Sequence, residues 1–263
     1  MTAPLLETRE LSRSFGALAA VRGMNFRLHA GARHALIGPN GAGKTTFINL
    51  LTGVLRPSRG QVLLDGRDIS TVSQAGRVKL GVARTFQINR LFRALSVLEN
   101  VYLGVAERLG AASSMLQPAG RRHDVIDEAM ALLVLLKLEG DAQRRVAELP
   151  YGRQRLVELA IALGLKPVLL LLDEPAAGVP SAESHIILDA IHALPADIGV
   201  LIIEHDMDVV FRFAQRITVM VEGAILTEGT AREIAADARV RAVYLGQEAR
   251  GTAHFAGTRE AAP

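Results

Sequence analysis

One uninterrupted segment of this chain fits the phosphate-binding pattern G-x-x-x-x-G-K-[ST] without a mismatch: Gly38-Pro39-Asn40-Gly41-Ala42-Gly43-Lys44-Thr45. Its glycines let the backbone approach phosphate oxygens closely, because no Cβ blocks the way, and successive N–H groups form a nest for an anion. Lys44 can reach the β- and γ-phosphates, and the Thr45 hydroxyl can ligate Mg²⁺. The segment therefore predicts a site for a nucleoside triphosphate.

A pair of acidic residues supplies a second candidate for chemistry. Asp173 and Glu174 follow an apolar run, residues 168–172, that is typical of a strand covered on both faces. At the carboxyl end of a parallel strand, Asp173 can hold Mg²⁺ directly or through water, and Glu174 can polarise the attacking water. A general base beside Mg²⁺ indicates a hydrolase, whereas a kinase would need an acceptor pocket. Without the phosphate loop, the same pair would equally fit a solvated turn.

The phosphate loop requires a strand before it and a helix after it. Residues 33–37 predict a short buried strand, and residues 45–51 predict a helix that ends at Gly53. Strand character also marks residues 5–11, 21–28, 62–66, 168–172, 200–203, 217–221 and 224–227. Helical spacing marks residues 96–109, 125–138 with a stop at Gly140, 152–165 and 231–245. Ser96 and Glu99 form a predicted capping box at the start of the first of these helices.

This order predicts an α/β fold: a phosphate-loop NTPase core with an antiparallel β subdomain and an inserted helical subdomain. We expect a single domain over residues 1–246. Its core and antiparallel layer take residues 1–86 and 167–246, and the helical subdomain takes about 87–166. Residues 247–263, rich in Ala, Gly and Thr, predict a loose tail.

The composition excludes several classes of protein. The chain has 263 residues, a net charge of +3, no cysteine and no tryptophan. Disulfides and cysteine metal sites are therefore impossible, and base-stacking platforms and nucleic-acid grooves are not expected. No apolar run approaches the ~20 residues that a bilayer span needs, so any membrane role must come through a partner.

At this point the chain resembles the ATP-binding cassette (ABC) ATPase family across nearly its whole length. The phosphate loop and Asp173-Glu174 resemble its Walker A and Walker B motifs. The segment Leu149-Pro150-Tyr151-Gly152-Arg153-Gln154 resembles the family signature, usually Leu-Ser-Gly-Gly-Gln. Gln87, in Arg84-Thr85-Phe86-Gln87, matches the Q-loop glutamine, His205 matches the switch histidine, and Phe15 matches the aromatic residue that stacks on adenine. Without the order and spacing of these motifs, a lone Gln, His or Phe would be interpreted as an ordinary structural residue.

The resemblance implies an ATPase that dimerises head to tail, with each ATP held between Walker A of one subunit and the signature of the other. The implied catalytic residues are Lys44, Glu174 and His205, and the implied metal-binding residues are Thr45, Gln87 and Asp173. The implied ATP-binding residues are Phe15, Gly38, Pro39, Asn40, Gly41, Ala42, Gly43, Lys44, Thr45, Thr46, Gln87, Tyr151, Gly152 and Gln154. The cofactors are ATP and Mg²⁺.

Finer resemblance points to the ATPases of branched-chain amino acid importers, carried by motifs such as Arg84-Thr85-Phe86-Gln87 and Tyr244-Leu245-Gly246. It implies a second ATPase subunit, identical or paralogous, a transmembrane permease and, indirectly, a substrate-binding protein. The implied location is peripheral, at the cytoplasmic face of the inner membrane. Urea, amide or lipopolysaccharide transport, a soluble ABC ATPase of DNA repair or translation, and a phosphate-loop kinase remain alternatives.

Two positions depart from the family pattern, and one cluster predicts a docking groove. Pro150 replaces the signature serine, and Pro180 stands where a polar residue usually crosses the dimer interface. Proline offers neither a hydroxyl nor an N–H, so we expect hydrolysis to survive with weaker coupling between the two sites. Beside Gln87, a surface groove formed with apolar residues is expected to receive a permease helix. These residues are Ile88, Leu91, Phe92 and Val97, and the alternative is that such apolar side chains pack internally.

Overall fold

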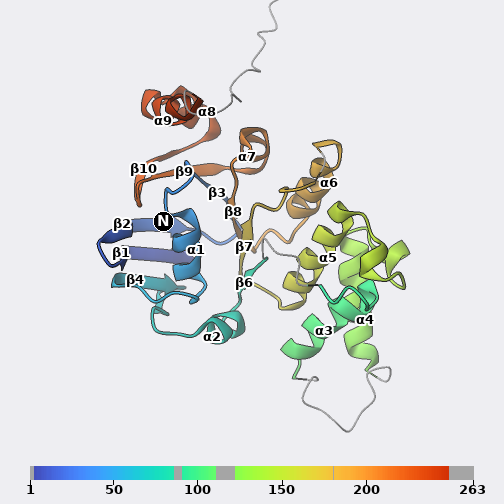
Figure 1. The fold of residues 1–263 in the computed structure, drawn as a ribbon. Helices are drawn as coiled ribbons and strands as arrows, with labels where there is room; N and C mark the ends of the chain where they lie inside the picture. Colours follow the sequence, from blue (N-terminus) through green and yellow to red (C-terminus); the bar gives the residue numbers. More distant parts are fainter. Residues whose placement is uncertain (1–2, 86–90, 111–121, 180, 249–263) are drawn as a thin grey trace, which may run out of the picture.

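The computed structural model describes residues 3–85, 91–110, 122–179 and 181–248 (Figure 1). Among these residues the strands form two sheets, one antiparallel and one mainly parallel. The α/β fold expected from the sequence is thereby confirmed. No helix of the described residues combines the length and the apolar character needed to cross a bilayer.

The antiparallel sheet has the order β2-β1-β4-β5. Its strands are β1 (Leu6–Phe15), β2 (Leu18–Leu28), β4 (Arg59–Leu64) and β5 (Arg67–Asp68). The side chains of β1 and β2 that face α1 (Lys44–Leu51) are apolar and buried, so this sheet covers the helix that follows the phosphate loop.

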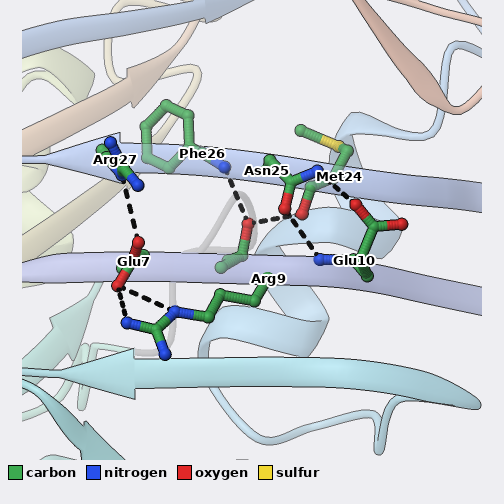
Figure 2. Close-up of polar contacts among 8 residues, drawn as sticks. Glu7, Arg9, Glu10, Met24, Asn25, Phe26 and Arg27 are labelled. Atoms are coloured by element: carbon green, nitrogen blue, oxygen red, sulfur yellow. Dashed lines mark hydrogen bonds and ion pairs between the residues drawn. The ribbon is translucent and has the colours of Figure 1, made fainter.

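Polar side-chain contacts also lie along β1 and join it to β2 (Figure 2). Glu7 accepts hydrogen bonds from the guanidinium groups of Arg9 and Arg27. Thr8 Oγ1 donates to the carbonyl oxygen of Met24 at 2.8 Å, which supplements the ladder between the strands.

The second sheet has the order β10-β9-β3-β8-β7-β6, with β10 antiparallel to β9 and the other neighbours parallel. Its strands are β3 (Arg33–Ile37), β6 (Val82–Arg84), β7 (Leu169–Asp173), β8 (Gly199–Ile203), β9 (Arg216–Val221) and β10 (Ala224–Gly229). Strands β3, β7 and β8 are buried along their whole length because both faces of the sheet are covered. Successive residues therefore join different cores: Leu171 packs with α1, whereas Leu170 and Leu172 pack with the helices on the opposite face.

The inserted helical part contains α3 (Val97–Arg108), α4 (His123–Leu135) and α5 (Tyr151–Gly164), and it lies to one side of the sheet in Figure 1. The predicted capping box at the start of α3 is confirmed: Ser96 Oγ accepts the N–H of Glu99, and the Glu99 carboxylate accepts the N–H of Ser96. Helix α4 ends earlier than expected, because Lys137 takes a left-handed φ of 57°. The predicted stop at Gly140 is therefore wrong.

Several elements were missed or merged by the sequence pattern. The missed helices are α2 (Gln74–Lys79), α6 (Ser181–His192) and α7 (Met207–Phe213), and the missed edge strands are β5 and β6. The single helix expected over residues 231–245 is two helices, α8 (Ala231–Ala236) and α9 (Ala238–Glu248). The break lies at Asp237, because its carboxylate accepts the N–H of Arg239 at 2.8 Å and begins a new helix there.

Candidate functional site

The phosphate loop connects β3 to α1 at the carboxyl edge of the parallel sheet. Gly43 caps α1 with a left-handed φ of 100°, and a Cβ at this position would collide with the carbonyl oxygen of Ala20 in β2. A Cβ at Gly38 would likewise collide with the carbonyl oxygen of Met220 in β9. The two glycines are thus required by close neighbours as well as by the turn, and the loop is held between two strands.

Lys44 lies inside the loop that it serves. Its Nζ donates hydrogen bonds to the carbonyl oxygens of Gly38 at 2.5 Å and Pro39 at 3.0 Å. Burial lowers the pKa of Lys44, and the nearby carboxylates of Glu174 and Asp173 oppose this effect. The phosphate loop and the acidic pair, far apart in the sequence, therefore share one electrostatic site.

Asp173 ends β7 with its carboxylate buried and paired. Arg84 Nη2, from the neighbouring edge strand β6, donates to Asp173 Oδ2 at 2.6 Å, and the side chains of Arg84 and Asp173 are 12% and 2% exposed. Arg84 Nη1 also donates to Asn49 Oδ1 of α1 at 2.7 Å. One guanidinium group therefore holds the acidic strand end against the phosphate-loop helix.

Glu174 and His205 face each other across the ends of β7 and β8. Glu174 Oε1 lies 3.6 Å from His205 Nδ1. The backbone of Glu174 is left-handed, with φ of 48°, and its N–H donates to the carbonyl oxygen of Ile203 at 2.9 Å. A non-glycine residue in this conformation is strained, so neighbouring contacts must hold it there.

Phe15 ends β1 with 44% of its surface exposed. The guanidinium carbon of Arg13 lies 4.7 Å from the centroid of its ring. The hairpin that carries Phe15 is tied close to the loop, because Arg22 N–H donates to Gly223 O at 2.7 Å and Gly223 N–H donates to Ala42 O at 2.9 Å. The ring thus presents a face to solvent from a hairpin that is anchored at the phosphate loop.

The signature-like segment forms the start of α5. Pro150 takes the N-cap position without a side-chain hydrogen bond, and Gly152 is buried. The ring of Tyr151 packs against Gly178 and under the Arg155 guanidinium, whose central carbon lies 5.2 Å from its centroid. Gln154 is buried, and its Nε2 donates to Leu149 O at 2.9 Å. In this chain the Gln154 amide stabilises the turn before α5, and its contact with a partner's nucleotide stays a prediction.

Gln87, Ile88 and Pro180, and residues 249–263 of the predicted tail, lie outside the described residues. For the proposed docking groove, Phe92 is 62% exposed, whereas Leu91 and Val97 are buried in the core of the helical part. The expectation that Leu91 and Val97 line a surface groove is therefore wrong. They are apolar side chains that face the neighbouring helices, and this is the more common use of such residues.

The donor set suits magnesium bound together with phosphate. The described residues hold no cluster of three or more His, Asp or Glu side chains that could bind a metal by themselves. Instead, Thr45 is exposed in the first turn of α1, and the carboxylate of Asp173 acts on its neighbour Lys44. Mg²⁺ prefers oxygen donors and usually completes its shell with water and phosphate, so these residues fit it.

Comparison with known proteins decides the family. The family model described as ABC transporter matches residues 21–177, which include the phosphate loop, the signature-like segment and Asp173-Glu174. The chain belongs to the ABC transporter family. It is thus an ATP-binding and ATP-hydrolysing cassette, as the resemblance implied. A second model, described as branched-chain amino acid ATP-binding cassette transporter, matches residues 224–250 of this ABC cassette.

Individual relatives agree with this assignment. The cassette is 37% identical to the high-affinity branched-chain amino acid transport ATP-binding protein BraF of Pseudomonas aeruginosa, over 94% of this chain and 100% of the relative. It is 37% identical to the corresponding protein LivG of Escherichia coli K12, with the same coverage. A crystal structure of an ABC transporter cassette in its ADP conformation has a TM-score of 0.83 and 31% identity, and covers 93% of this chain and 100% of that chain.

Sequence reasoning missed two residues of the site, Arg84 and Glu204. Arg84 belongs to the motif that ends at Gln87, but its partner Asp173 is 89 positions away. Glu204 is buried beside His205, at the end of an apolar strand. An acidic residue that directly follows a fully apolar strand, as Asp173 does, is the signal that could have drawn attention to it.

Proposed function

We propose that this ABC cassette hydrolyses ATP with Glu174 as general base and His205 as the group that contacts the γ-phosphate. The observation that carries these roles is the 3.6 Å approach of Glu174 Oε1 to His205 Nδ1, beside the loop that holds Lys44. Glu174 would orient and deprotonate water, and Lys44 would neutralise charge on the β- and γ-phosphates. Thr45 and Asp173, with Gln87, would hold Mg²⁺, which supplies further neutralisation of phosphate charge.

The proposed assembly is a head-to-tail dimer that works at a membrane. Gly152 lies at the N-terminus of α5, where backbone N–H groups can face an anion. We propose that they face the γ-phosphate of the ATP bound by the partner subunit. Phe15, exposed beside the phosphate loop, would stack on adenine. The cassette would pair with an identical or paralogous ATPase and bind a permease at the cytoplasmic face of the inner membrane. Closure of the dimer would drive transport.

The proposed cargo is a branched-chain amino acid. It is supported by the match of residues 224–250 to the branched-chain cassette model and by full-length similarity to BraF and LivG. The cassette itself holds the motor, so the cargo is tested with a permease and a binding protein. ATP-dependent uptake of leucine, isoleucine or valine into vesicles supports the proposal, and uptake of urea or short amides instead would overturn it.

The variant Glu174→Gln tests the hydrolytic role directly. It keeps the shape of the side chain and removes the base, so we expect ATP binding to stay within about twofold while turnover falls by about 10²–10⁴, the range that general-base catalysis supplies. ATP-bound dimers should accumulate, as measured by size-exclusion chromatography with ATP. Turnover near that of the unmodified protein would show that Glu174 is not the base.

A further inference from the structure

Glu204 is a buried carboxylate next to His205, at the edge of the sheet where β7 and β8 end. It follows β8, and its side chain is 2% exposed. A buried carboxylate is costly unless it is hydrogen-bonded or paired. Burial raises the pKa of Glu204, and hydrogen bonds from the backbone N–H groups of Ala176 and His205 oppose that effect. Burial of the Glu204 carboxylate thus costs folding free energy, and its hydrogen bonds indicate what it does in return.

The carboxylate ties together the two loops that carry Glu174 and His205. Its Oε1 accepts the N–H of Ala176, two residues after Glu174, at 3.3 Å, and its Oε2 accepts the N–H of His205 at 3.2 Å. The same Oε2 lies 3.9 Å from His205 Nδ1. One carboxylate therefore contacts the turn after β7 and His205, the second residue after β8, at the same time.

These contacts extend the sheet beyond its regular end. The register of β7 and β8 ends with Asp173 opposite Ile203, and the next bond is Glu174 N–H to Ile203 O. Beyond that point the chain turns, and the Glu204 side chain supplies the acceptor that a strand backbone no longer offers to Ala176. The strained backbone of Glu174, with φ of 48°, is thus held by one bond at its own N–H and another two residues later.

The histidine is fixed from both sides. Glu204 accepts its N–H, and Asp206, on its other side, caps α7 by accepting the N–H groups of Asp208 and Val209. The His205 backbone is therefore held between a buried carboxylate and a helix cap. Its imidazole, which is 65% exposed, faces Glu174 Oε1 from this fixed base.

We propose that Glu204 is a positioning residue of the ATPase site, whose carboxylate sets the placement of Glu174 relative to His205. The inference rests on the hydrolytic roles proposed for those two residues. Glu204 touches neither nucleotide nor water in this role; it acts through the loops that carry the reacting groups. A displacement of about 1 Å in such groups can lower the rate up to about 10²-fold, so the effect belongs in kcat.

The test replaces Glu204 by glutamine in the full chain. The amide oxygen of glutamine can accept one of the two N–H groups, but its NH₂ meets the other as a second donor. We expect kcat for Mg-dependent ATP hydrolysis to fall about tenfold, while KM and the Kd of a fluorescent ATP analogue stay within about twofold. Amide exchange at Ala176 and His205 should become faster. Unchanged kcat, or a loss that appears in KM with kcat intact, would overturn the proposal.

A second variant, Glu204→Asp, separates position from charge. It keeps the carboxylate but shortens the side chain, so it cannot reach both N–H groups; we expect kcat to fall at least as far as in Glu204→Gln. A kcat of Glu204→Asp equal to that of the unmodified protein would show that the charge alone matters, and it would overturn the positioning role. This variant carries the test if Glu204→Gln does not fold.

Two further variants separate this inference from the proposed mechanism. Glu7→Gln removes a carboxylate that is also largely closed to water (11% exposed), whose partners are Arg9 and Arg27 in the antiparallel sheet, and it should leave kcat unchanged. Glu174→Gln is measured in parallel. If Glu174→Gln keeps its turnover, the proposed base is wrong; if it is inactive while Glu204→Gln is normal, the positioning role alone fails.

Discussion

Replacement of Arg84 by methionine removes the cation that holds Asp173 against the phosphate-loop helix. The pair is nearly closed to water, with exposures of 12% and 2%, and its N–O distance is 2.6 Å. Loss of one partner of a buried ion pair costs about 3–5 kcal/mol, mainly because a charge stays buried without its partner. Because Arg84 keeps some contact with solvent, we expect the lower value, about 3 kcal/mol in the free energy of unfolding.

The expected loss is measured by urea unfolding and by the melting temperature. For a domain of this size, about 3 kcal/mol corresponds to a fall in Tm of about 6–12 °C. Arg84→Lys is the matched control: it keeps the charge but loses the two-pronged geometry that serves Asp173 and Asn49 together, so it should lose less.

A double-mutant cycle gives the sharpest result. The double variant Arg84→Met with Asp173→Asn holds neither charge of the pair, so no buried charge is left without its partner. Its free energy of unfolding should therefore exceed the value predicted from the sum of the two single losses by at least about 1 kcal/mol. A loss below about 0.5 kcal/mol for Arg84→Met, or strict additivity with Asp173→Asn, would refute the reasoning that this pair is buried and coupled.

Two further predictions concern the phosphate loop and the strand that leads into it. Gly43→Ala should lower ATP affinity at least about tenfold, since left-handed backbone costs an L-residue about 1–2 kcal/mol and the new Cβ meets Ala20 O; titration with a fluorescent ATP analogue measures it. Gly66→Ala, also left-handed at φ of 74° but with open space around the new Cβ, is the control and should keep its affinity; equal effects of the two changes would contradict the steric argument. Burial lowers the pKa of His34 to about 4, below its ordinary value of 6.5, while Nε2 lies 2.8 Å from Thr218 Oγ1. Because the unfolded chain binds this proton more readily, the stability from neutral His34 is full above pH 6.5 and is lost as the pH falls toward 4, at about 1.4 kcal/mol per pH unit. His34→Gln should remove this part of the slope of unfolding free energy between pH 6.5 and 5; an identical slope in variant and unmodified chain would show that His34 is not its source.

Local features of the sequence were sufficient for the elements that depend on near neighbours. The phosphate loop, the capping box at Ser96 and the left-handed Gly53 at the end of α1 each involve residues within a few positions of one another. The apolar strands β3, β7 and β8 were also predictable, because their burial on both faces removes polar residues from them. The phosphate loop and the acidic end of β7 also carry the family resemblance that the comparisons confirm.

Other features depended on partners that no local pattern reveals. The edge strand β6 has three residues and is defined by its pairing with β7, so its own composition carries little signal. The chain breaks between α8 and α9 because the Asp237 carboxylate accepts the N–H of Arg239 and so caps the start of a new helix. The sequence shows that Leu91 and Val97 are apolar, but it does not show whether they face a core or a surface. That depends on the elements that pack against them.

The sequence by itself determined which chemistry this chain carries: a phosphate loop, a strand ending in Asp173-Glu174, and a histidine after another strand. Only the tertiary structure decided how that chemistry is held. Arg84 reaches Asp173 because β6 and β7 are neighbours in the sheet, and Glu204 reaches Ala176 because β7 and β8 end together. Hydrogen bonds act over about 3 Å in space, whatever the separation along the chain. The types of the candidate site residues can therefore be recognised from short segments of the sequence, while the contacts that place them depend on the order of the strands.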